Sequence, residues 1–162
     1  MSDAYTLWKA AHVVSATVVF GTGLGIAYFT WFGYRRAMRA GDLGALRTIL
    51  RLTVIADASL TAPAVAFQLA SGLVLMRLLG WPWVSPWSIA VLGLVALAGA
   101  CWLPVLAMQV RLHRTAARAP SIATLPAAFH RWFGAWFVLG VAAFAATLAL
   151  FYLMVAKPLA VA

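Results

Sequence analysis

The sequence predicts an all-α fold, a four-helix transmembrane bundle in a single integral membrane domain spanning residues 1–162. Hydrophobic residues make up 65% of the chain and charged residues only 9%, a balance far from that of soluble domains. The chain also contains four long apolar runs, and each exceeds the roughly 20 residues that a helix needs to cross a bilayer. These runs predict transmembrane helices at about residues 5–34, 52–79, 87–110 and 132–156. A lipid bilayer is therefore the expected surrounding of most of the chain.

The positive charges gather at one end of the predicted bundle. The net charge is +9, and most arginines flank the first and third connections, namely Arg35, Arg36, Arg39, Arg47, Arg51, Arg111, Arg114, Arg118 and Arg131. The positive-inside rule then places these connections in the cytoplasm and both termini on the opposite side. We expect these arginines to set the topology and to contact lipid headgroups, and we expect no nucleic-acid partner.

The first predicted helix carries the main candidate site near its start. Lys9 and His12 lie one turn apart in an otherwise apolar run, on a helical stripe that also contains Ala16 and Gly23. An ionisable side chain within a membrane span is a functional-site candidate, because hydrocarbon penalises its charge. The run is too long for the core of a cleavable signal peptide, so we expect it to remain a helix.

Two further features follow His12 along the chain. Gly21 and Gly25 form a GxxxG pair, which permits close approach by another helix. The connection over residues 35–51 alternates basic and apolar residues, a pattern typical of a short amphipathic segment on the cytoplasmic surface.

The second predicted helix has a polar stripe at steps of three and four residues. Its members are Asp57, Thr61, Ala64, Gln68 and Ser71. We expect the hydroxyl and amide groups to form hydrogen bonds between helices. Asp57 has two open interpretations, a proton-handling group or half of a structural ion pair with an arginine. Pro63 is expected to kink the helix near this stripe.

The third and fourth predicted helices contribute fewer candidates. Pro104 predicts a second kink. His113 and His130 fall among the arginines of the third connection, so we expect both at the wet cytoplasmic surface. Met154 and Lys157 end the fourth helix at about the membrane depth of His12.

Several short motifs together resemble a known bacterial family. They are K-x-x-H, G-x-G-x-G, A-D-x-x-x-T-x-P-x-x-x-x-Q-x-x-x-G, W-L-P-V-x-x-x-Q and L-M-V-x-K-P. The combination covers nearly the whole chain and resembles the predicted integral membrane proteins of domain of unknown function 2269. The resemblance implies a four-helix, multi-pass protein of the bacterial inner membrane, and the arginine distribution places both of its termini on the periplasmic side. More distantly, the architecture with a histidine at the first helix start is similar to the small haem-binding membrane protoporphyrinogen oxidase and to copper-resistance membrane domains.

These features lead to a hypothesis of redox or porphyrin-related function with haem b. His12 is the expected axial ligand, because a neutral imidazole binds haem iron and bundles commonly hold cofactors between helices. Met154, Lys9 or Lys157 are alternatives for the second ligand, and the two lysines are also candidates to pair with the haem propionates. Gln68 is expected beside His12, because antiparallel packing brings that end of the second helix opposite it.

Three alternatives remain open at this point. His12 is equally explained as a buried structural histidine bonded to Gln68 or to a carbonyl. Copper binding would use His12, Met76 and Met154, since thioether ligands suit Cu(I). A non-enzymatic accessory subunit would use its small-residue faces to form a homo-oligomer or join a larger membrane complex. The sequence does not decide whether the protein is an enzyme.

Overall fold

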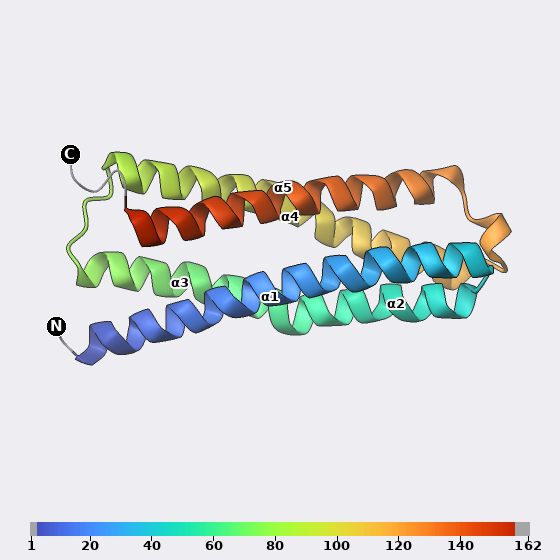
Figure 1. The fold of residues 1–162 in the computed structure, drawn as a ribbon, viewed down its shortest axis with the longest axis horizontal. Coiled ribbons are helices and arrows are strands. Elements are labelled where there is room, and N and C mark those ends of the chain that lie inside the picture. The colour runs from blue at the N-terminus through green and yellow to red at the C-terminus, as the bar shows by residue number, and fades with distance from the viewer. Residues whose placement is uncertain (1–2, 158–162) are drawn as a thin grey trace.

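The computed structural model describes residues 3–157, which fold into long helices without a strand (Figure 1). The elements are α1 (Asp3–Ala40), α2 (Leu43–Ala56), the π-helical segment η1 (Asp57–Thr61), α3 (Ala62–Leu78), α4 (Pro86–Arg118), the 3₁₀ turn η2 (Ile122–Thr124) and α5 (Ala127–Ala156). Since α2, η1 and α3 run on as one apolar helix, the described residues contain four helices long enough to span a membrane. The predicted all-α four-helix fold is confirmed.

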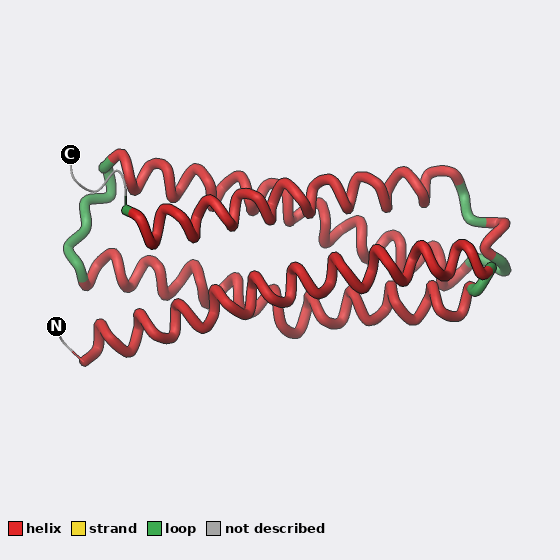
Figure 2. The backbone as a smooth tube through the Cα atoms, viewed as in Figure 1, coloured by secondary structure: helices red, strands yellow, loops and turns green. Residues whose placement is uncertain are grey.

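The helices run back and forth between two ends of the molecule. α1 begins and α5 ends at one end, which we call the terminal end, and the helices are joined only by short loops (Figures 1 and 2). The opposite end is formed by the turn after α1 and by the connection between α4 and α5. We call it the arginine-rich end, because the arginines of both connections lie there.

At the arginine-rich end, all four helices extend beyond the predicted bounds. In place of a separate surface segment over residues 35–51, α1 runs to Ala40 and a tight turn leads directly into α2. Gly41 takes a positive φ of 67°, and the Asp42 side chain caps α2 by accepting a 2.8 Å hydrogen bond from the Ala45 N–H. The predicted amphipathic segment is therefore not a separate element but forms the end of α1 and the start of α2, because arginine is a good helix former and its charge does not end a helix.

One of these arginines has a structural role in the bundle. The guanidinium group of Arg47 on α2 donates hydrogen bonds to the carbonyl oxygens of Ala116 and Ala119, at 3.0 and 2.7 Å. These carbonyls lie at the end of α4, where backbone acceptors lack partners within the helix. Arg47 thus fastens the end of α4 to α2.

The main core lies in the arginine-rich half of the bundle. There α4 packs against both α5 and α2, and α2 packs against α1. Phe129, Leu46, Leu50 and Leu112 are fully buried in this core. In the terminal half, α1 pairs with α3 and α4 pairs with α5, and a smaller cluster around Trp87 joins the second pair. The packing therefore changes along the bundle from one common core to two helix pairs, which are joined where Phe20 of α1 packs against Phe144 and Phe151 of α5.

The close helix contact made by a glycine is at Gly33 rather than at the GxxxG pair. A Cβ atom added to Gly33 would lie 2.9 Å from Cγ1 of Ile49 on α2, whereas a Cβ on Gly21 or Gly25 would meet nothing within 4 Å. Gly33 thus allows α1 and α2 to approach closely. The GxxxG face stays free of contacts from the other described residues at this distance.

Replacing Gly33 by alanine is expected to lower the free energy of unfolding by about 1 kcal/mol, since an overpacked side chain must shift. Gly21→Ala adds the same methyl group on the same helix without a clash, and should be neutral or slightly stabilising. Unfolding in mixed detergent–SDS micelles, followed by circular dichroism, measures both. Equal stability of the two variants would contradict the close contact at Gly33.

Candidate functional site

His12 lies between α1 and α3 in the terminal half of the bundle. Its Nδ1 atom is 2.7 Å from the Ser71 hydroxyl, and its Nε2 atom is 2.8 Å from the amide nitrogen of Gln68. The imidazole also lies against Gly72, where an added Cβ would be 3.4 Å from its Cε1 atom. We call His12, Gln68 and Ser71 the His12 cluster. Antiparallel packing predicted Gln68 opposite His12, and the two side chains are in contact.

The hydrogen bonds of the His12 cluster define the tautomer of the imidazole. An amide nitrogen only donates, so Nε2 of His12 accepts and carries the lone pair. The proton is then on Nδ1, which donates to the Ser71 oxygen. The Ser71 hydroxyl in turn donates to the backbone carbonyl of Gln68 at 3.2 Å. Among the described residues, the buried Gln68 Oε1 atom has no hydrogen-bond partner. The cluster is thus a neutral histidine with one unused amide oxygen beside it.

The other predicted cofactor ligands lie at the terminal end but contact different groups. The ammonium of Lys9 lies 5.8 Å from the Tyr5 ring centroid, and that of Lys157 lies 5.6 Å from the Trp81 ring. Met154 is 38% exposed on the surface of α5. Of the residues predicted around a cofactor, only Gln68 forms a hydrogen bond with His12.

A row of hydroxyl groups continues the polar interface from the His12 cluster toward the middle of the bundle. Ser15 donates a 2.9 Å hydrogen bond to the Ala64 carbonyl, and Thr61 donates to Thr22 at 3.0 Å. We call the contacts of Ser15 with Ala64 and of Thr22 with Thr61, together with the His12 cluster, the polar seam. Ser15 and Thr22 were not among the residues predicted from the sequence. Their seven-residue spacing, which keeps one helix face, was the signal that could have found them.

Asp57 lies at the other end of the polar seam and is 3% exposed. The side chains of Thr61, Gln109 and Trp102 are placed to hydrogen-bond its carboxyl group. All three are neutral, so these neighbours provide no charge to balance a carboxylate. Thr61 also bonds Thr22, and it therefore connects Asp57 to α1.

The π-helical segment η1 begins at Asp57. The N–H group of Ala62 bonds the Asp57 carbonyl five residues back, instead of the four of an α-helix. Pro63 follows immediately and cannot donate a backbone hydrogen bond. The irregularity expected from Pro63 is thus located in the preceding turn, where it positions Asp57. Segments of this kind occur frequently at functional sites.

The two remaining histidines have different surroundings. His130 is exposed at the arginine-rich end, and its Nδ1 atom is 2.7 Å from the hydroxyl of Tyr34 on α1. His113 is half-buried, and its Nδ1 atom is buried without a hydrogen-bond partner among the described residues. A wet cytoplasmic surface position was predicted for both. His130 is exposed, whereas His113 is only half-exposed because α4 continues as a packed helix beyond the predicted end.

The fold and its buried polar groups define an integral membrane protein with four long helices. Its helix interfaces contain a histidine cluster and a carboxyl group. The chain belongs to the predicted integral membrane protein family DUF2269, whose model matches residues 6–158. Neither a curated protein nor a solved structure matched the chain. The family assignment agrees with the resemblance found in the sequence, whereas the more distant similarity to a haem-binding oxidase stays a prediction.

Proposed function

We propose that this protein binds a b-type haem through Nε2 of His12 and performs redox or porphyrin-related work in the terminal half of the bundle. One observation carries the proposal. Nδ1 of His12 lies 2.7 Å from the Ser71 hydroxyl, and a proton assigned to Nδ1 leaves the lone pair on Nε2, which is the arrangement that orients a histidine for binding a metal. In the described structure the side-chain amide of Gln68 donates a hydrogen bond to this lone pair. Iron bound at Nε2 would replace that hydrogen bond.

The composition of the site favours haem over a bare metal ion. The described residues contain no group of three His, Cys, Asp or Glu side chains that could hold a metal ion. Copper would therefore require Met76 and Met154, and Met154 is exposed on α5. Haem supplies four iron ligands of its own, so a single imidazole suffices.

Two groups at the terminal end suit the rest of a haem. Lys9 and Lys157 provide positive charge for its propionates, and each already lies over an aromatic ring. Bound haem would supply one-electron redox chemistry. In this proposal His12 provides the axial ligand, Ser71 orients it, and Gln68 is the group displaced.

The absorption spectrum of purified protein, expressed with haem precursor supplied, tests the proposal. We expect a Soret band in the wild type, its loss in His12→Ala, and its retention in the matched control His130→Ala. Ser71→Ala should keep the haem with a shifted reduction potential, because the proton on Nδ1 loses its acceptor. Circular dichroism checks that each variant is folded. A colourless wild-type protein would refute haem binding.

We also propose that Asp57 handles protons and does not form a structural ion pair. The neutral surroundings of its carboxyl group support this choice, as does the hydroxyl contact from Thr61 to Thr22 on α1. Asp57 would exchange protons with groups along the polar seam. Asp57→Asn keeps the shape and removes the titrating group, so any measured turnover that needs protons should fall while the fold is kept.

A second candidate function is that of a non-enzymatic accessory subunit. It is favoured by the GxxxG face of α1, where a Cβ on Gly21 or Gly25 would meet nothing within 4 Å. Such a face lets a helix of another membrane protein approach closely. If this function is correct, a stoichiometric partner should co-purify with the wild type and be lost in Gly21→Leu/Gly25→Leu, and the wild type should be colourless.

A further inference from the structure

The positive charge at the arginine-rich end exceeds the negative charge that the chain places there. The chain has three acidic residues. Asp3 lies in the first turn of α1 at the terminal end, Asp57 is buried among neutral groups, and Asp42 caps α2 at the arginine-rich end. One exposed carboxylate does not balance the nine arginines of this end, so the arginines at the end of α1 suit an anion from outside the protein.

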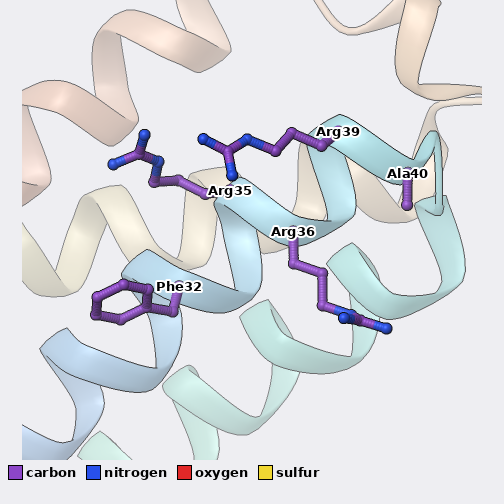
Figure 3. Close-up of a pocket in the computed structure, with 5 residues that line it drawn as sticks. All are labelled: Phe32, Arg35, Arg36, Arg39 and Ala40. Atoms are coloured by element: carbon purple, nitrogen blue, oxygen red, sulfur yellow. The ribbon is translucent and has the colours of Figure 1, made fainter.

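These arginines line a groove of about 770 Å³ on the surface of α1 (Figure 3). Its lining residues are Phe32, Arg35, Arg36, Arg39 and Ala40. The guanidinium groups of Arg35 and Arg39 extend to the same side of the helix, whereas Arg36 extends toward α2. Like charges four residues apart on a helix repel each other. An anion between Arg35 and Arg39 would remove this repulsion.

Two aromatic side chains beside these arginines are typical of a membrane interface. Phe32 is 54% exposed one turn before Arg36, and it forms an apolar part of the lining. Arg35 lies 5.7 Å over the ring of Trp31, a cation–π contact that restricts its position. Aromatic residues beside arginines are typical of the zone between hydrocarbon and headgroups.

We propose that this groove binds the phosphate of an anionic phospholipid. Arg35 and Arg39 donate hydrogen bonds to the phosphate oxygens, since the planar guanidinium group matches two oxygens at once. Phe32 contacts the upper part of an acyl chain, which favours a lipid over free phosphate. The site lies at the opposite end of the bundle from His12 and does not depend on the proposed haem.

Native mass spectrometry of protein released from nanodiscs tests this site. The nanodiscs contain dioleoyl phosphatidylglycerol and dioleoyl phosphatidylcholine in equal amounts. We expect the wild type to retain phosphatidylglycerol preferentially. Arg35→Gln/Arg39→Gln should lower this retention about 25-fold, because each arginine that contacts the anionic lipid contributes about fivefold. Arg35→Lys/Arg39→Lys should be intermediate.

The matched control is Arg51→Gln/Arg111→Gln, which removes the same charge at the same end outside the groove. It should lower retention less than twofold, and circular dichroism checks that all variants are folded. An equal loss in both double variants would mean diffuse surface attraction and overturn the site. Displacement of the lipid by inorganic phosphate would identify a free-phosphate pocket instead, and equal retention of phosphatidylcholine would mean an adventitious lipid.

Discussion

Replacing Phe129 by alanine is expected to lower the free energy of unfolding by about 3 kcal/mol. Phe129 is fully buried in the core at the arginine-rich end, and its ring stacks on Tyr34 of α1 at a centroid distance of 6.4 Å. Phenylalanine-to-alanine changes in cores usually cost about 3–5 kcal/mol. We expect the lower end of this energy range, because helices in a membrane are held together by side-chain packing and not by the transfer of apolar groups out of water.

Unfolding in mixed detergent–SDS micelles, followed by circular dichroism, measures the effect of Phe129→Ala. Val138→Ala is the matched control on the same helix, since Val138 is 66% exposed to the surroundings of the bundle. We expect the control to change stability by no more than about 0.5 kcal/mol. Similar losses at both positions would show that the core is not centred on Phe129.

Removal of the Asp57 carboxyl group is expected to have the second largest effect. Asp57→Ala leaves the side chains of Gln109 and Trp102 without their shared acceptor, whereas Thr61 keeps its hydrogen bond to Thr22. Hydrogen bonds between membrane helices contribute about 0.6 kcal/mol each, and buried donors left unpaired cost about 1–3 kcal/mol. We therefore expect a loss of about 2 kcal/mol, measured by the same unfolding assay.

Asp57→Asn separates the structural role of this group from its titration. The amide oxygen of asparagine still accepts hydrogen bonds, so the expected loss is below about 1 kcal/mol. Ser59→Ala is the control within η1, because Ser59 is exposed and bonds only the Ile55 carbonyl of its own helix. If Asp57→Ala were as stable as Ser59→Ala, the carboxyl group would not hold α4 against η1.

The bundle and the two ends of the polar seam could be predicted from the sequence. Apolar runs of membrane length require helices, since backbone groups in hydrocarbon must be bonded within the segment. Helical periodicity placed Asp57 and Gln68 on one face. Antiparallel packing of neighbouring helices then brought Gln68 opposite His12. Each of these features depends on local pattern or on chain connectivity.

Other features depended on the tertiary structure. The contact of Ser71 with His12, the approach of Gln109 and Trp102 to Asp57, and the choice of Gly33 over Gly21 for close packing all depend on how each helix is rotated about its axis. That rotation results from the packing of many side chains at once, which no single segment encodes. Local sequence pattern and connectivity are sufficient to embed His12 and Asp57 in a four-helix membrane bundle and to bring Gln68 opposite His12. The contacts of Asp57 with Gln109 and Trp102 needed the folded bundle, because these residues lie on α4 and reach Asp57 only through the rotation of both helices.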